Sequence, residues 1–108
     1  MDKNELEVKA VKAFENLQAA RERLFQAAEK AIYTAMKLED EKSSLLSSGK
    51  IDGKNEEIRK AQIRELAGSA FDELAIMQNN ERAARYQFDK ASAEVDAVKT
   101  LLRIAELQ

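Results

Sequence analysis

Any chemistry carried out by this chain would have to come from its charged and hydroxyl side chains, because the sequence contains no histidine and no cysteine. Those two residues supply the commonest general base, the usual nucleophile–base pairs and most zinc ligands. The densest carboxylate run is Glu39-Asp40-Glu41. Its members occupy consecutive helical positions, about 100° apart around the helix axis, so they do not converge on one ion. We therefore expect no catalytic residue and no metal site.

The glycine pattern that precedes a lysine, Gly49-x-x-x-Gly53-Lys54, differs from a phosphate-binding loop. It is too short, and it lacks the Ser or Thr that follows the lysine in such loops. We expect no bound cofactor, and we predict that the chain is not an enzyme.

Basic side chains that could contact phosphate or an acidic protein form two groups. The first surrounds the middle of the chain and comprises Lys50, Lys54, Arg59, Lys60 and Arg64. The second is Arg82 and Arg85, beside Tyr86, and a cationic groove with a stacking aromatic is how single strands are bound. Both groups also have a plainer interpretation, as an exposed polar turn and a solvated helix surface. The formal net charge of −2 differs from the strong positive excess of a nucleic-acid-binding arm.

The elements that must position these side chains are helices. The chain has no proline and only three glycines, all between residues 49 and 68, and it is rich in strong helix formers. This distribution predicts an all-α fold with two long helices, residues 3–47 and 55–107, joined by a turn over residues 48–54. We expect Asp52-Gly53 to need a positive φ, Gly49 to end the first helix and Asn55 to cap the second. At Gly68 we expect a continuous helix, with a kink as the alternative.

Apolar residues follow a heptad spacing in both halves, which is typical of a coiled-coil-like antiparallel hairpin. The first seam is Leu6, Ala10, Ala13, Leu17, Ala20, Leu24, Ala27, Ala31, Thr34, Leu38, Glu41 and Leu45. The second is Ile63, Ala67, Ala70, Leu74, Met77, Glu81, Ala84, Phe88, Ala91, Val95, Val98, Leu102 and Ala105. A flanking row widens the first stripe and comprises Val11, Phe14, Phe25, Ala28, Ile32 and Ala35.

Folding the two halves together about residue 51 sets an expected register. In that register Phe14 faces Phe88, and the misfit Glu81 of the second seam faces Arg21. A charge in a seam needs a partner, and such a pair commonly sets register. We therefore predict Arg21 and Glu81 as a register pair, with Arg23 as the alternative partner of Glu81.

Two isolated helices would leave much of the wide apolar stripe in water, so self-association is expected. The simplest form is a homodimer that builds a four-helix bundle over part of its length. The segment after Val98 has little to pair with inside the hairpin. Its apolar side chains are the predicted contact with a second copy or a protein partner: Leu101, Leu102, Ile104 and Leu107.

The turn also resembles a known pattern. The run Gly53-Lys54-Asn55-Glu56-Glu57-Ile58-Arg59-Lys60 is similar to a Gly-Lys-Asn-x-x-x-Arg-Lys pattern in small uncharacterised helical proteins of tailed bacteriophages and prophages. There too the second helix runs on through Glu-Arg-Ala-Ala-Arg-like segments to an Arg/Leu-rich end. The resemblance covers residues 47–105. It implies a phage accessory protein, and it brings no catalytic residues with it.

The sequence therefore favours a non-catalytic, phage-type protein-binding module. It would act as an accessory factor or an inhibitor on a host or phage protein through a helical face. One alternative is a nucleic-acid-associated accessory protein in phage replication or recombination, and another is a structural assembly factor. No apolar run approaches the roughly 20 residues that span a bilayer, and the N-terminal residues lack a signal-peptide pattern, so we expect no membrane partner and a cytoplasmic location in the host cell.

Overall fold

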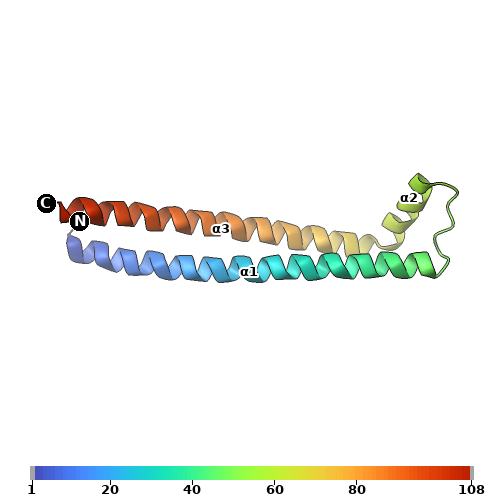
Figure 1. Cartoon of the computed structure of the whole chain (residues 1–108), viewed down its shortest axis with the longest axis horizontal. Helices are drawn as coiled ribbons and strands as arrows, with labels where there is room; N and C mark the ends of the chain where they lie inside the picture. Colours follow the sequence, from blue (N-terminus) through green and yellow to red (C-terminus); the bar gives the residue numbers. More distant parts are fainter. Residues whose placement is uncertain (1, 108) are drawn as a thin grey trace. The chain divides into compact units, whose positions relative to one another are not determined.

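The computed structural model describes residues 2–107 and contains three helices within them: α1 (Lys3–Ser47), α2 (Glu56–Leu66) and α3 (Gly68–Glu106) (Figure 1). No strand occurs in this range, so the all-α prediction is confirmed, and the two long helices pack together. The chain divides into two compact units. Unit 1 is Met1–Gln26 with Arg82–Gln108, and unit 2 is Ala27–Glu81. Along residues 2–107 none of the helices carries an apolar stretch that could cross a bilayer.

Unit 1 is built from the first part of α1 and the last part of α3. Its buried cluster is Ala13, Val95 and Val98, and Ala10, Leu17 and Leu102 pack against it. The Lys99 ammonium lies 5.5 Å from the centre of the Phe14 ring, and the Arg21 guanidinium lies 6.0 Å from that of Phe88. Positions that advance along α1 therefore meet positions that recede along α3, so the two segments of unit 1 run antiparallel.

Unit 2 combines the second part of α1 with α2 and the start of α3. Its α1 segment buries Ala31, Thr34 and Leu38. Across to α3, the Lys37 ammonium lies 3.9 Å from a Glu73 carboxylate oxygen. The core positions are mostly small, so the helices approach closely and the buried layer is thin.

Burial follows the predicted seams. Every residue of the second seam is buried or half-buried, and so is every residue of the first except Glu41, which is exposed. Within the flanking row, Val11, Phe14, Phe25 and Ile32 are exposed, whereas Ala28 and Ala35 are half-buried. The heptad spacing thus identified the contact faces correctly.

The expected register is wrong in unit 1. Phe14 contacts Lys99 rather than Phe88, and Arg21 contacts Phe88 rather than Glu81, which are shifts of about three and two helical turns. The physical reason is that the chain between Ser48 and Ala67 forms a loop and a separate short helix instead of extending the pairing from residue 51. The alignment from which we predicted that Glu81 faces Arg21 is therefore not the observed one, because Arg21 lies over Phe88. Glu81 belongs to unit 2, and an ion pair between its side chain and Arg21 stays a prediction.

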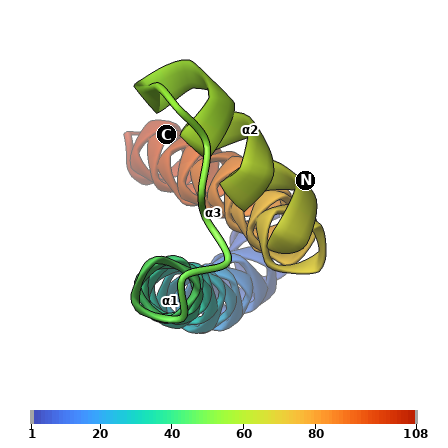
Figure 2. The same ribbon diagram turned by 90° about the vertical axis from the view of Figure 1, so that its right-hand side faces the viewer.

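The expected continuous second helix is also wrong. α2 ends at Leu66, Ala67 leaves the helical conformation with φ −101° and ψ 21°, and α3 begins at Gly68. Within unit 2, Figures 1 and 2 show that α2 departs from the direction of the start of α3. The break at Ala67 costs little free energy, because the next residue, Gly68, is a poor helix former. It also lets Ala67, which is 1% exposed, become the most deeply buried seam residue.

The loop before α2 is fastened to that helix by Gln62. The Gly53 backbone N–H donates to Gln62 Oε1 at 2.9 Å, and Gln62 Nε2 donates to Asp52 Oδ1 at 2.7 Å. Gly53 does not have the positive φ that we expected. It is needed for close approach instead, since a Cβ there would lie 2.6 Å from Ile58 Cγ2.

The two predicted caps are present. Asn55 accepts the Ile58 N–H at 2.9 Å and is the N-cap of α2. Gly49, just after α1, has a φ of +77°. The left-handed conformation at Gly49 is the usual glycine ending of a helix.

Candidate functional site

The last turns of α3 in unit 1, together with Leu107 just after the helix, expose large apolar side chains. Leu101 and Ile104 are about half exposed, and Leu107 is 83% exposed. Leu102, which we grouped with them, is half-buried and packs against the Ala13, Val95 and Val98 cluster. Three of the four predicted contact residues therefore present apolar surface, whereas Leu102 contributes to the core. We call Leu101, Ile104 and Leu107 the tail surface.

A groove in unit 2 gathers basic and apolar side chains from all three helices. It has a volume of about 570 Å³ and is lined by Lys42, Lys60, Ala61, Ile63, Arg64 and Phe71. The Arg64 guanidinium lies 4.4 Å from the centre of the Phe71 ring, and the Lys42 ammonium lies 5.2 Å from it. Both distances suit cation–π attraction, which orients the cations toward the ring. We call these six residues the basic groove.

Two of the lysines in the basic groove also pair with carboxylates on their own helices. Lys42 Nζ lies 3.1 Å from Glu39 Oε1, and Lys60 Nζ lies 3.4 Å from Glu56 Oε1. All four side chains reach solvent, so each pair contributes a few tenths of a kcal/mol at most. Such pairs can be exchanged for new partners at small cost.

The structure brings together only part of the first predicted basic group. Lys60 and Arg64 line the basic groove, but Lys50 and Lys54 do not. Arg59 donates from Nη1 to the Gly53 carbonyl oxygen at 3.2 Å and so supports the loop. Lys42 was missed, because only the correct register places the end of α1 beside Phe71.

The second predicted basic group lies in unit 1. Arg82, Arg85 and Tyr86 are exposed on α3. None of them lines the basic groove, which belongs to unit 2.

Another hollow in unit 2 is acidic. It is shallow, has a volume of about 360 Å³, and is lined by Ile32, Ala35, Met36, Glu39 and Asp40 of α1. Glu41, the third member of the carboxylate run, is not among them. Within residues 2–107 no group of three or more carboxylates is arranged to hold a metal ion. We call these five residues the acidic patch.

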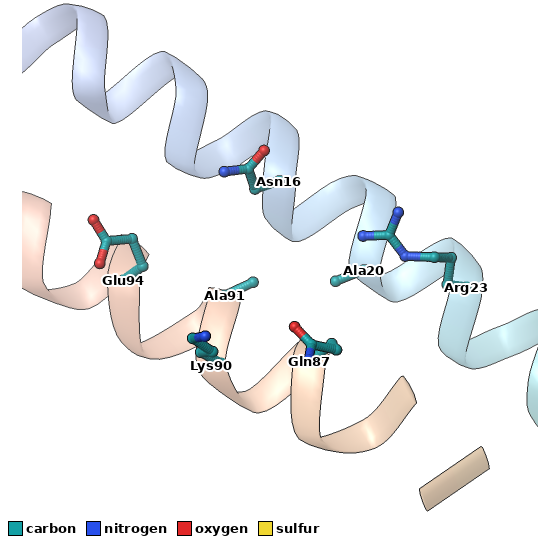
Figure 3. Close-up of a pocket in the computed structure, with 7 residues that line it drawn as sticks. All are labelled: Asn16, Ala20, Arg23, Gln87, Lys90, Ala91 and Glu94. Carbon is teal, nitrogen blue, oxygen red and sulfur yellow. The ribbon is translucent and has the colours of Figure 1, made fainter. Parts of the chain in front are cut away.

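A cleft in unit 1 lies between α1 and α3 (Figure 3). Its volume is about 280 Å³, and Ala20 and Ala91 face each other across its floor. Its rim carries Asn16, Arg23, Gln87, Lys90 and Glu94. Because the rim mixes both charges around two methyl groups, it offers no converging set of ligands for an anion or a metal.

The chain was compared with protein-family models, with characterised proteins and with solved structures, and no match was found.

Proposed function

We propose that the chain is a non-catalytic protein-binding module of the phage type, cytoplasmic in the host cell, that acts on a host or phage protein as an accessory factor or inhibitor. The observation that carries this proposal is the placement of large apolar side chains on the outside of a thin, alanine-lined core. Leu101 and Ile104 at the end of α3, with Leu107 just after it, form the surface offered to the partner. Exposed apolar side chains that gather at one end of an element commonly mark protein contacts.

We also propose how the helices assemble, as a hairpin within one chain and as a bundle between two chains. The antiparallel packing within each unit supports a helical hairpin that pairs with a second copy into a four-helix bundle. A homodimer would cover apolar side chains that a single chain leaves in water.

The experiment is affinity capture with the full chain and a matched variant. Leu101→Asp/Ile104→Asp introduces charge on the tail surface, and Val8→Asp/Val11→Asp introduces the same charge at exposed positions of α1. The proposal is supported by a protein that is captured by the wild type and by the α1 variant but not by the tail variant. The purified partner should then also bind the wild type and the α1 variant with similar affinity and the tail variant more weakly. Equal binding to both variants contradicts it.

A second function, contact with nucleic acid, is favoured by the basic groove alone. Lys42, Lys60 and Arg64 could hold phosphates. Phe71 is a poor stacking platform, however, because two cations already lie within 4.4–5.2 Å of its ring centre. A salt titration of single-stranded DNA binding tests this function, since phosphate contacts give affinity that falls steeply with salt. Absence of binding at low salt would remove it.

A further inference from the structure

We infer that the protein partner binds through an amphipathic helix that lies along the outward side of α3 in unit 1, with basic residues of that helix against Asp89 and Asp96. This inference rests on the proposed function, because it names the kind of segment that the tail surface meets. It extends the contact from the tail surface along about five turns of α3.

α3 carries a second row of apolar side chains in unit 1. Its members are spaced by seven, four and seven residues and are Tyr86, Ala93, Ala97 and Ile104. At about 100° per residue, all four point within about 40° of one another around the helix axis. Each of them is exposed. We call these four residues the outer row.

The outer row lies on the side of α3 that α1 does not cover. Val95 and Val98 belong to the buried cluster that packs against α1, and they lie about 180° and 120° around the helix from Tyr86. Tyr86 is 64% exposed and Ile104 is 49% exposed. Heptad spacing is the pattern by which one helix packs on another. Since folding of unit 1 covers only one of the two rows of α3, the outer row favours a helix as its occupant.

The shape of the outer row also suits a helix. Ala93 and Ala97 in the middle allow another helix to approach closely, and larger side chains of that helix can pack over their methyl groups. Tyr86 and Ile104 project at the two ends, about 27 Å apart at 1.5 Å per residue. The tail surface, which includes Ile104, widens one end of the row. An amphipathic helix of about five turns would cover this length.

One edge of the outer row is acidic. Asp89 and Asp96 are seven residues apart and lie about 60–80° around the helix from Tyr86, on the same side of the row. Both are exposed, and within residues 2–107 neither side chain has an ion pair or a hydrogen bond. A partner can therefore pair with these two carboxylates without displacing a cation of the same chain.

The edge charges state what a partner helix should carry. Arg103 continues the edge of Asp89 and Asp96 seven residues further on, and the opposite edge carries Lys90 and Glu94, whose charges cancel. The best complement is a helix with two basic residues seven apart and an acidic residue after a further seven, beside its apolar row. Charges at the edges of a heptad row set which helices pair and in which direction.

A second copy of the chain is a poorer occupant of the outer row. When two copies pair antiparallel about a two-fold axis, the edge with Asp89 and Asp96 meets the same edge of the other copy, so like charges oppose each other. In a parallel pair that edge meets Lys90 and Glu94, so attraction and repulsion offset each other. A partner helix with basic residues at the edge has neither disadvantage.

The test measures binding of two synthetic helical peptides to the full chain by fluorescence anisotropy. Both peptides have three heptads, about 31 Å of helix, with leucine in one heptad row. The positions that border this row on both sides are lysine in the first peptide and glutamate in the second. The wild type should bind the lysine peptide roughly tenfold more tightly than the glutamate peptide, because only lysine can pair with Asp89 and Asp96.

A charge swap locates the peptide on the chain. The edge variant is Asp89→Lys/Asp96→Lys, and its matched control is Glu7→Lys/Glu15→Lys, at exposed carboxylates of α1 in unit 1. The edge variant should reverse the preference and bind the glutamate peptide more tightly, whereas the control should keep the preference of the wild type. Tight binding of the glutamate peptide would also show that the edge variant is folded.

The outer row is tested by a single charge. Ala97→Asp places a carboxylate beneath the bound peptide, and Ala19→Asp places one at an exposed alanine of α1 in unit 1. Ala97→Asp should weaken binding of the lysine peptide roughly tenfold, because the carboxylate loses water without gaining a partner in the apolar row. Ala19→Asp should leave binding unchanged, and circular dichroism at 222 nm checks that both variants keep the helix content of the wild type.

Several results would overturn the inference. They are equal binding of the two peptides by the wild type, an edge variant that keeps the wild-type preference, and an Ala97→Asp variant that binds like Ala19→Asp. A wild-type dimer that excludes the peptide in sedimentation equilibrium, and that dissociates with Ala97→Asp, would assign the outer row to a second copy and overturn the inference as well.

The tail variant separates this inference from the proposed function. A captured partner that is lost with Leu101→Asp/Ile104→Asp but still binds Ala97→Asp and the edge variant supports the proposed function and overturns the inference. If the peptides bind in the expected order while no protein is captured, the outer row is a helix-binding surface and only the proposed function is contradicted.

Discussion

The buried cluster of unit 1 allows a stability test in which the same chemical change is made at buried and exposed sites. The perturbation is Val95→Ala/Val98→Ala, at residues that are 4% and 3% exposed. The matched control is Val8→Ala/Val11→Ala, at residues that are 70% and 59% exposed on α1. Both double variants remove the same four methyl groups, so they differ only in where those groups lie.

The expected magnitude follows from the burial. Each valine loses two methyl groups worth about 0.8 kcal/mol apiece when buried, so the core variant should lose about 3 kcal/mol. The added cavity cost should be small, because the half-buried neighbours Ala10, Leu17 and Leu102 can relax into the space. In the control most of the removed surface already faces water, and alanine is the better helix former, so its change should stay within about 0.5 kcal/mol.

The assay is urea unfolding followed at 222 nm, with the change in free energy taken from the shift in midpoint and the slope. All samples need the same protein concentration, because the proposed self-association would make apparent stability depend on it. Equal midpoint shifts in the core variant and the control would refute the assignment of Val95 and Val98 to the core. A larger shift in the control would refute the exposure of Val8 and Val11 on α1.

The remaining predictions concern the region between α1 and α3. Gly68→Ala should raise stability by up to about 1 kcal/mol, because a Cβ there meets nothing within 4 Å and alanine favours helix; a lower melting temperature would contradict this. Gly49→Ala should lower stability by about 1 kcal/mol, because φ is +77° there, and an unchanged melting temperature would count against that conformation. Gly53→Ala should speed hydrogen exchange of its own amide, which donates to Gln62, since the new Cβ would lie 2.6 Å from Ile58 Cγ2. Asn55→Ala should lower the free energy of unfolding by about 1 kcal/mol, whereas Asn55→Asp should change it little, because aspartate also caps helices. Equal melting temperatures of the two variants would argue against the cap.

The contact faces of the long helices could be predicted because they depend on local spacing. A heptad pattern fixes which side of a helix is apolar, whatever that side meets. Ala13, Ala20, Ala31, Val95 and Val98 were therefore identified as seam positions and are buried. Asn55 was equally predictable, since its capping bond goes to a backbone amide three residues away.

The register could not be predicted from the same pattern. Heptads repeat, so several alignments of two seams bury nearly the same side chains. The choice depends on where the chain reverses, and that depends on the break at Ala67 and on the bonds from Gln62 to Asp52 and Gly53. No periodicity encodes these features, which are a backbone break, a bond between two side chains and a bond from a loop amide to a side chain. The basic groove was missed in part for this reason, because Lys42 meets Phe71 only in the observed register.

The distribution of large side chains is the physical basis of the proposed association. Its α1 core positions are filled largely by alanine, as at Ala13, Ala20 and Ala31, while the bulkier Phe25, Ile32 and Met36 lie on exposed flanks. A chain selected only for folding alone gains most by burying its largest apolar side chains, because the free energy of burial scales with area. Alanine at the buried positions shortens the distance between the helix axes. The larger apolar side chains then remain exposed on the flanks of α1. In unit 2 the exposed Ile32 and Met36 line one shallow hollow with Ala35, Glu39 and Asp40, so folding of the single chain leaves this apolar flank of α1 uncovered.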